Sequence, residues 1–533
     1  MSFTSFEFFC FLALTLLLYY TLPKKVQWVI LLISSFIFYA FAGGFYLPYI
    51  LITIISSYII SVIMKKNADR EKAYIAENKA TLDKEQRKAY KAREKKKRFY
   101  VLIIGLVINF GMLAVLKYTG FTISNINSII HVFNKEASIL IPEMILPLGI
   151  SFYVFQTTGY LIDVYRDKTQ AETNIFKLAL FVSFFPQLLQ GPISRHSDLA
   201  SQLFTEHKCK WDNLSAGLLR IAYGYFKKLI IADTVMIAIS KIIGAPDTYN
   251  GIYVIFLIIA YSIQIYADFT GGIDITIGIA EMLGIKLKEN FDHPFASKST
   301  KEYWNRWHIT MGSWFTDYIF YPLSICKPMQ KLSKWSRSKL GNELGKRIPV
   351  YLATIATWFL TGLWHGASWN FIVWGLLNCL VILVSQELTP LYTKFHKACP
   401  KLVASKFWDV FAKSRTFMLM GTIRILDCYR DVPQTFKNIG TIFYKFDTYA
   451  SFFSGGIKSL GLELSEYVLI GLGILTVFIV SKFQKVDGES LRHKISKYPA
   501  LTFACVGTLI VLILIFGAYG LNYDASQFIY TQF

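Results

Sequence analysis

The sequence predicts an all-α polytopic membrane protein, and three observations support this fold class. Of the 533 residues, 54% are hydrophobic and only 17% are charged, against roughly 25% charged in an average soluble protein. Several windows of about 20 residues are nearly free of charge, which is the length an α-helix needs to cross the hydrocarbon core of a bilayer. The basic residues gather between these windows. One continuous membrane domain over residues 1–533 is the simplest organisation.

Seven apolar windows are the clearest candidate spans. Shorter and more polar segments raise the expected total to about eleven transmembrane helices. Residues 6–20 resemble the apolar core of a signal peptide, but they lack a basic start and a small-residue cleavage site, so a retained first helix is expected. The seven windows are residues 8–22, 26–42, 47–64, 100–116, 350–364, 467–480 and 500–521.

The formal net charge of +21 is compatible with binding to nucleic acid or to an anionic membrane. The positions of the basic residues distinguish these two partners. Residues 65–98 hold 14 Lys and Arg against 6 Asp and Glu. This segment is expected to be a basic cytoplasmic loop or an interfacial helix on an anionic leaflet. In both cases the partner is the lipid bilayer, and no nucleic acid is expected.

The positive-inside rule then orients the chain. With residues 65–98 inside, counting spans places the N-terminus outside. Five basic residues lie between positions 482 and 497, whereas the tail at 522–533 contains no Lys or Arg. Both termini are therefore predicted to be extracytoplasmic, in a multi-pass protein of a bacterial cell membrane. Residues 388–431 are more polar and are expected to form an interfacial segment.

Polar groups enter apolar stretches between residues 260 and 375. Residues 261–284 carry Gln264, Asp268, Asp274 and Glu281, and a carboxylate at the middle of a bilayer costs about 2.5–3.5 kcal/mol on the lenient insertion scale. These groups must face protein or water. The segment at 299–323 is rich in aromatic residues but also contains polar ones, so it is expected to be a broken or re-entrant helix lining a cavity.

His365 lies in a second apolar stretch, where it is flanked by tryptophans. In a soluble protein a lone histidine on an apolar helix is usually a packing residue, but an ionisable group inside a membrane is a functional candidate by default. Gly362 and Gly366 on either side would allow a substrate to approach the ring. The seven cysteines form no CxxC pair and show no metal-ligand spacing with the eight histidines, so no metal site is expected.

The chain resembles the membrane-bound O-acyltransferase (MBOAT) family, in the branch of alginate O-acetylation and teichoic-acid D-alanylation proteins. The resemblance covers most of the chain and is strongest between residues 147 and 375. It implies a core of transmembrane and re-entrant helices around a central tunnel, with residues 145–375 as the catalytic core. The motifs are PLGISFYVFQTTGYLIDVYR (147–166), FFPQLLQGPISR (184–195), YFKKLIIAD (225–233), the block at 268–290, YWNRWH (303–308) and GLWHGASWNFIVWG (362–375).

The resemblance assigns His365 to the family's characteristic histidine and His308 to a second histidine of this branch. A neutral imidazole suits the removal of a hydroxyl proton during acyl transfer from a thioester. His365 is expected to be this base, and His308 to orient the acceptor or to donate a hydrogen bond to the thioester oxygen. Many relatives carry Arg where this chain has Thr316. Further tunnel or donor-binding candidates are Trp304, Asn305, Arg306, Asp317 and Trp364, and Arg306 and Lys301 could also contact lipid headgroups or solvent.

The last six residues of the sequence are FIYTQF, in which Phe528, Tyr530 and Phe533 follow the final span. An aromatic belt at the membrane surface is one explanation. The hexapeptide also resembles the C-terminal motif of the small partner protein in teichoic-acid D-alanylation, whose tyrosine is thought to carry the acyl group. On that resemblance, Tyr530 is predicted to be the first acyl acceptor.

The expected function is transfer of an acyl group, preferably acetyl, from a cytoplasmic thioester to an envelope or extracellular polysaccharide by way of Tyr530. The donor would be acyl-CoA or an acyl carrier protein, with no permanently bound cofactor. An extracytoplasmic SGNH-type acyltransferase would be the partner that modifies the polymer. The alternatives are D-alanyl-type transfer from a carrier protein, a transporter or flippase, and a non-catalytic scaffold; no GxSxG elbow, P-loop or repeat is present.

Overall fold

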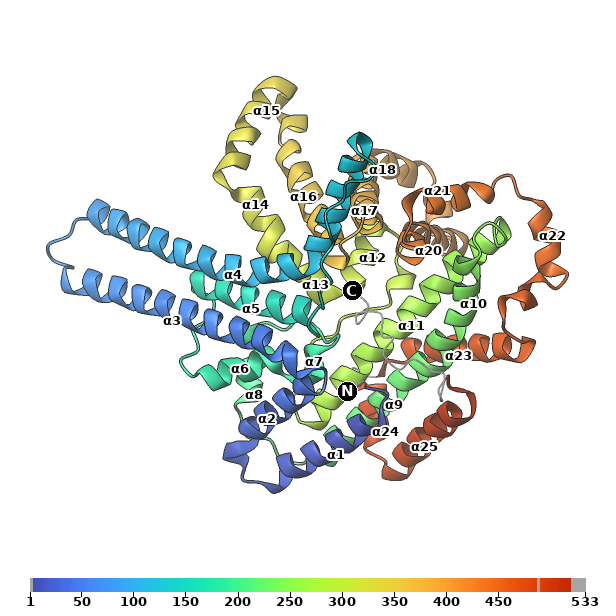
Figure 1. The fold of residues 1–533 in the computed structure, drawn as a ribbon, viewed down its shortest axis with the longest axis horizontal. Coiled ribbons are helices and arrows are strands. Elements are labelled where there is room, and N and C mark those ends of the chain that lie inside the picture. The colour runs from blue at the N-terminus through green and yellow to red at the C-terminus, as the bar shows by residue number, and fades with distance from the viewer. Residues whose placement is uncertain (1–2, 487–488, 519–533) are drawn as a thin grey trace. The chain divides into compact units, whose positions relative to one another are not determined.

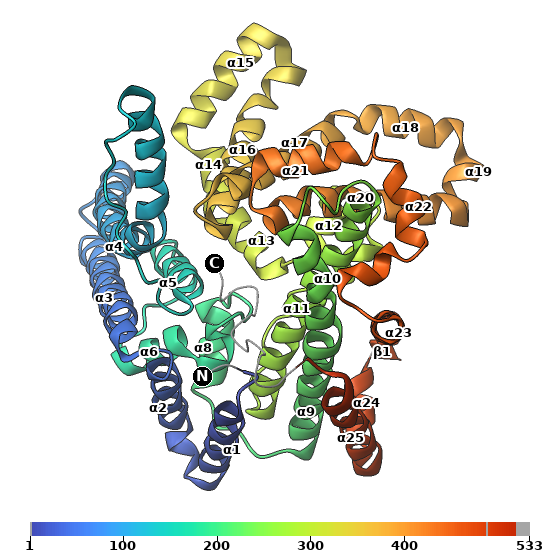
Figure 2. The same ribbon diagram turned by 45° about the vertical axis from the view of Figure 1, so that its right-hand side comes forward.

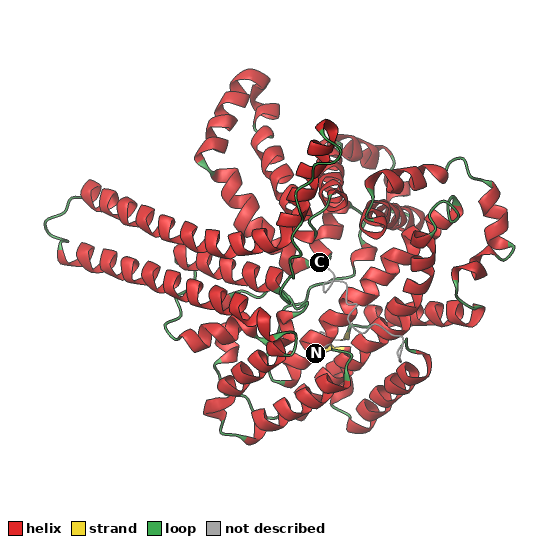
Figure 3. Cartoon of the chain, in the orientation of Figure 1, coloured by secondary structure: helices red, strands yellow, loops and turns green. Residues whose placement is uncertain are grey.

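The computed structural model describes residues 3–486 and 489–518, which are almost entirely helical (Figure 3). Two compact units share the chain: Met1–Leu214 with Ile279–Leu287, and Ser215–Gly278 with Lys288–Phe533. The chain passes between the units within α9 (Trp211–Tyr225) and α11 (Ile252–Met282). The single domain expected from the sequence stays a prediction, and each unit is described by itself.

The first unit contains α1 to α8 (Figure 1). Its longest helices, α3 and α4, pack along each other and against α5. A buried ion pair between Arg98 of α4 and Glu71 of α3 (2.9 Å) joins the two. The helices are α1 (Phe6–Thr21), α2 (Gln27–Ala40), α3 (Leu47–Glu77), α4 (Lys84–Phe133), α5 (Ile150–Tyr165), α6 (Ile175–Ser183), α7 (Phe185–Leu188) and α8 (His196–Leu203), with 3-10 turns at Lys24–Val26 and Gly44–Tyr46.

Residues 65–98 do not form a separate loop or a separate interfacial helix. They are the last turns of α3, a short turn, and the first turns of α4. Asp83 caps α4 by accepting from the Gln86 N–H (2.7 Å), while the Gln86 side chain accepts from the Asp83 N–H (3.1 Å). Because this capping box starts a helix that runs without a break into an apolar stretch, the basic residues lie on extensions of two apolar helices.

The second unit contains the rest of the described helices. Its interior follows α11, where nearly every side chain before the unit boundary is buried. The elements are α9, α10 (Asp233–Gly244), α11, α12 (Thr300–Arg306), α13 (Ile309–Phe315), α14 (Tyr321–Ile325), α15 (Lys327–Gly345), α16 (Ile348–His365), α17 (Trp369–Glu387), α18 (Thr389–Ala398), α19 (Pro400–Val403), α20 (Lys406–Tyr429), α21 (Val432–Thr441), α22 (Asp447–Phe453), α23 (Leu464–Lys482), α24 (Leu491–Ser496) and α25 (Pro499–Phe516), with π-helices η3 (Phe226–Ala232) and η5 (Thr316–Phe320), 3-10 turns η4 (Pro294–Ala296) and η6 (Gly456–Leu460), and a two-residue hairpin, β1 (Lys485–Val486) with β2 (Glu489–Ser490).

Six helices in the described part of the chain are long and apolar enough to cross a membrane: α3 with its preceding turn, α4, α11, α17, α23 and α25. The apolar α1 is shorter. These helices confirm the all-α polytopic fold class. The expected total of about eleven depends on shorter or more polar helices, so the number stays a prediction. The interfacial segment expected at 388–431 is helical and comprises α18, α19 and α20.

Candidate active site

The segment around His308 is a broken helix, as its mixed composition predicts. α12 ends at Arg306 and α13 starts at Ile309, and His308 between them has a φ of 49°. A positive φ is uncommon for a residue other than glycine and has to be held by its surroundings. The break therefore sets the position of the His308 ring.

Asn290 holds this break together. Its backbone oxygen accepts from the Ile309 N–H (3.0 Å), and its Oδ1 accepts from both the backbone N–H (3.0 Å) and the hydroxyl (2.9 Å) of Thr310. The same Oδ1 lies 3.3 Å from Nδ1 of His308. A backbone N–H can only donate, which identifies the amide atom as oxygen and makes His308 Nδ1 a donor.

This contact selects a role for His308. The ring is completely buried, and burial disfavours a charged imidazolium. In a neutral ring that donates through Nδ1, Nε2 is the accepting nitrogen. Of the two roles expected for His308, donation to a thioester oxygen through Nε2 does not agree with this tautomer, and orientation of the acceptor stays a prediction.

His365 is the last residue of α16, which packs against α17 (Figure 2). Its ring is partly buried among Trp364 (4.9 Å between centroids), Trp374 (4.7 Å) and Phe371 (6.4 Å). The ring of Trp364 also lies 6.0 Å from that of His308. The structure thus brings His308 and His365 to the same tryptophan from two separate elements.

The glycines around His365 serve helix packing. A Cβ at Gly362 would lie 2.4 Å from the backbone oxygen of Phe371, and one at Gly366 would lie 2.1 Å from the Phe371 ring. The expectation that these glycines open space for a substrate is therefore wrong, because Phe371 fills that space. Because neither glycine has a side chain, α17 can approach α16 closely next to His365.

Trp304 belongs to the same aromatic cluster. Its ring lies 5.6 Å from that of Trp374, and its Nε1–H donates to Oδ1 of Asn378 (3.3 Å). Asn378 in turn donates to the backbone oxygen of Trp374 (2.8 Å). Trp304 is thus connected to His365 through Trp374.

The remaining predicted residues in this segment are Asn305, Arg306 and Asp317. Asn305 is exposed, and Arg306 forms an ion pair with Glu302 on the same helix (2.8 Å). Asp317 is partly buried in the π-helix η5, directly after α13. Donor-phosphate binding by Arg306 stays a prediction. Tyr530, Phe528 and Phe533 lie outside the described residues.

Arg424 of α20 is a further residue of the site region that the sequence pattern does not mark. Its guanidinium lies 4.1 Å above the ring of Trp307, and it donates to the Tyr303 hydroxyl (2.6 Å). The side chain is buried. A desolvated cation over a tryptophan face is worth about 2 kcal/mol or more, so Arg424 helps to fix the residue that precedes His308.

Two carboxylates of α11, Asp268 and Asp274, face protein cations. Asp268 pairs with Lys228 (2.6 Å), which also binds Asp233 (2.8 Å). Lys228 and Asp233 belong to the YFKKLIIAD motif. The η3 helix, which lies within this motif, packs next to α11. The carboxylates, which must face protein or water, therefore face protein.

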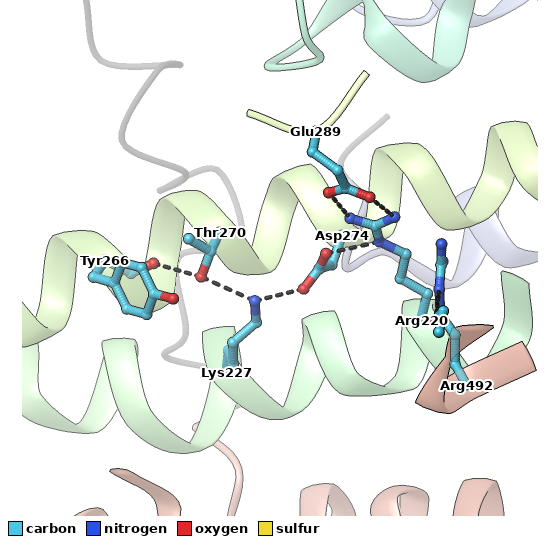
Figure 4. A network of polar contacts seen from close by, with 8 residues as sticks. Arg220, Lys227, Tyr266, Thr270, Asp274, Glu289 and Arg492 are labelled. Carbon is cyan, nitrogen blue, oxygen red and sulfur yellow. Dashed lines mark hydrogen bonds and ion pairs between the residues drawn. The ribbon is translucent and has the colours of Figure 1, made fainter. Parts of the chain in front are cut away.

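A second ionic network joins α9, η3, α11 and the segment after α11 (Figure 4). Asp274 accepts from Arg220 Nε (2.8 Å) and from Lys227 Nζ (2.5 Å). Arg220 also forms a two-bond pair with Glu289 (2.8 and 2.6 Å), and Lys227 donates to the Thr270 hydroxyl (2.9 Å). Removal of one partner from such a buried pair leaves an uncompensated charge.

Helices suited to crossing a membrane, and two histidines whose rings contact the same tryptophan, define this chain as a membrane-embedded enzyme candidate, and comparisons identify the class. The model of the membrane-bound O-acyltransferase family matches residues 170–409. A probable alginate O-acetylase of Azotobacter vinelandii is 32% identical over 76% of this chain and 71% of its own length.

Two other relatives are named for different activities. A peptidoglycan O-acetyltransferase of Helicobacter pylori is 31% identical over 70% of this chain and 67% of its own length. A teichoic acid D-alanyltransferase of Bacillus subtilis is 27% identical over 51% of this chain and 65% of its own length. This chain belongs to the membrane-bound O-acyltransferase family, and it is a multi-pass membrane O-acyltransferase.

Proposed function

We propose that this enzyme transfers an acyl group, preferably acetyl, from a cytoplasmic thioester to a hydroxyl group at the two-histidine site. The observation that carries the proposal is the meeting of His308 and His365 at Trp364 in a chain of this family. The names of two relatives specify O-acetyl transfer, which favours acetyl. The donor is acyl-CoA or an acylated carrier protein.

In the proposed reaction the acceptor oxygen attacks the thioester carbonyl carbon. A C–O bond forms and the C–S bond breaks, while His365 takes the hydroxyl proton and returns it to the leaving thiolate. His308, which meets His365 at Trp364, orients the acceptor. Base catalysis of this kind contributes roughly 10²- to 10⁴-fold to the rate.

Tyr530 is the proposed first acceptor. A phenol with an ordinary pKa of about 10 is a better leaving group than a sugar hydroxyl, so an acyl-tyrosine stays activated for a second transfer. The tail would then deliver the acyl group on the extracytoplasmic side. There an SGNH-type partner would transfer it to an envelope or extracellular polysaccharide, the class of acceptor named for the alginate and peptidoglycan relatives.

D-alanyl transfer from a carrier protein is the second candidate function. It is favoured by the 27% identity to the teichoic acid D-alanyltransferase of Bacillus subtilis. The same histidines would act, and only the acyl group and its carrier would differ. The mass added to the acceptor distinguishes the two, because an alanyl group carries an amine that acetyl lacks.

Mass spectrometry of the C-terminal peptide tests the relay. During turnover a fraction of Tyr530 should carry the acyl group, and the variant Tyr530→Phe should lose polymer acylation. Tyr523→Phe in the same tail is the matched control and should behave as wild type. A tyrosine that is never acylated, together with normal polymer acylation in Tyr530→Phe, would remove the relay but leave the acyltransferase itself.

A further inference from the structure

A cavity lies in the unit that contains His308 and His365, but neither of these histidines is in its wall. It has a volume of about 630 Å³ and is bounded by α9, η3, α11, α23, α24 and α25. Ligand pockets commonly have volumes of about 300–1,000 Å³. The volume is sufficient for part of an extended small molecule, and no step proposed above uses it.

One end of this cavity is ionic. The network of Arg220, Lys227, Asp274 and Glu289 forms part of the wall, and Arg492 of α24 lies at the end of this network (Figure 4). Asp274 is bound by Arg220 and Lys227, and Glu289 by Arg220. The two carboxylates are thus neutralised within the network, and the three cations give this end an excess of one positive charge.

Much of the remaining cavity wall is apolar, although several polar side chains such as Thr476 and Gln484 also line it. Phe226 and Ile273 line it on the side of η3 and α11, and Leu509 and Leu512 line it from α25. The cavity therefore pairs a charged end with an aliphatic compartment. This is the pattern expected for a ligand with an ionic head and a hydrocarbon chain.

The helices that close the cavity on one side, α23 and α25, also have exposed apolar faces. In the windows of α23 and α25 that could span a membrane, only 11% of the residues are buried. Exposed large apolar side chains include Phe478 and Ile479 on α23 and Leu514 and Ile515 on α25. A membrane lipid can thus reach the cavity from the adjacent hydrocarbon, without passing through water.

Basic residues gather at the charged end. Lys482 ends α23, Arg492 and Lys494 lie in α24, and Lys497 precedes α25. Each Lys or Arg near an anionic membrane surface contributes about 1 kcal/mol of attraction. The wall positions on α23 are at the end of that helix next to this basic segment, whereas those on α25 run from Ala504 to Leu512, through the middle of the helix and away from the segment.

We propose that this cavity binds an anionic phospholipid. The phosphate headgroup lies at Arg492 and Lys227, and one acyl chain lies along Leu509 and Leu512. A free phosphate ion would use the cationic end but leave the aliphatic compartment empty. The lipid is favoured because the wall provides for both parts of the molecule and because helices with exposed apolar faces enclose it.

The test uses the full chain, purified in detergent and freed of bound lipid. Native mass spectrometry compares phosphatidylglycerol with phosphatidylcholine carrying the same acyl chains. Phosphatidylglycerol should bind more tightly, and Arg492→Gln should reduce that preference about fivefold, the effect of about 1 kcal/mol. Lys494→Gln is the control: it removes the same charge from the same helix at a position outside the wall, and in detergent there is no anionic membrane surface for that charge to attract, so the lipid preference should stay at the wild-type value.

Cys505 provides a second readout without any substitution, because it lines the cavity. Phosphatidylglycerol should slow its alkylation by a maleimide, while the exposed Cys10 in the same sample serves as the internal reference. Filling the cavity with Thr508→Trp or Leu509→Trp should abolish the preference for phosphatidylglycerol, with thermal unfolding used to select a folded variant.

Three results would overturn the proposal. The first is equal binding of the two lipids to wild type, and the second is an equal loss of preference in Arg492→Gln and Lys494→Gln. The third is protection of Cys505 by inorganic phosphate alone to the same degree as by the lipid, which would indicate an anion site. None of these results bears on acyl transfer at His365, so failure here and failure of the proposed function are distinguishable.

Discussion

His308 and His365 meet at Trp364 but differ in their surroundings. His308 is completely buried in a strained backbone conformation and donates to Asn290. His365 ends α16 and is held between aromatic rings. The first ring is therefore fixed in one tautomer by a polar contact, whereas the second is positioned by packing. This difference supports separate roles in orienting and deprotonating an acceptor.

Asn290 is predicted to be a positioning residue for His308. Asn290→Ala removes the oxygen shared by His308 and Thr310, so kcat should fall roughly 10- to 100-fold, less than the 10²- to 10⁴-fold loss expected when an acid–base residue itself is removed. Asn290→Asp keeps an accepting oxygen and should recover part of the loss. The measurement is the separation of kcat from KM for acyl transfer.

Thr310→Val serves as the control for this prediction. It removes only the hydroxyl contact to Asn290, at a cost of about 1 kcal/mol in stability. Its kcat should stay close to wild type. A wild-type kcat in folded Asn290→Ala would show that the His308 tautomer does not matter.

The sequence could identify both histidines because each is a titratable group in an apolar stretch. It could not identify Asn290 or Arg424. Asn290 lies 18 positions before His308 and meets it only because α12 turns back, and Arg424 reaches Trp307 from α20. Contacts between distant segments leave no periodic signal in a single sequence.

At the level of elements, irregular helices position His308 and the buried lysines. The break between α12 and α13 presents His308, the π-helix η5 follows directly, and η3 brings two lysines toward α11. π-Helical turns occur frequently at functional sites. The mixture of aromatic and charged residues at 299–323 indicated a broken helix, but the composition did not indicate where the break falls.

The packing of α16 on α17 gives a prediction for Gly362. In Gly362→Ala the new Cβ meets the backbone oxygen of Phe371, and overpacking of this kind typically costs about 1–3 kcal/mol. The thermal unfolding midpoint in detergent should fall, and activity should fall with it because His365 shares the helix.

Gly471→Ala in α23 is the matched control, because no heavy atom lies within 4 Å of the new Cβ. Alanine is favoured over glycine in a helix by about 1 kcal/mol, so this variant should be as stable as wild type or slightly more so. Equal midpoints for Gly362→Ala and wild type would contradict the packing role.

At the level of the whole molecule, composition predicted the class of fold because few backbone structures satisfy all of their hydrogen bonds inside a bilayer. The lengths of individual helices were less predictable. Residues 65–98 continue α3 and α4, since charged residues with high helix propensity extend an apolar helix into water as readily as they form a loop.

Orientation in the membrane gives the prediction at this scale. A cysteine at Asn522 should react with a membrane-impermeant maleimide in intact cells, because the tail is predicted to be outside. A cysteine at Lys79, in the exposed turn between α3 and α4, should react only after permeabilisation. Labelling is measured as the increase over the parent chain with its seven cysteines. The reverse pattern would invert the orientation.

The most direct test of the account is the O-acyl content of envelope polysaccharide in cells whose only copy of this enzyme is His365→Ala. Loss of a catalytic base lowers the rate by roughly 10²- to 10⁴-fold, so acylation should fall to background at normal protein level. His396→Ala, at an exposed histidine of α18, should retain wild-type acylation. Wild-type acyl content in folded His365→Ala would contradict the assignment of this histidine as the base.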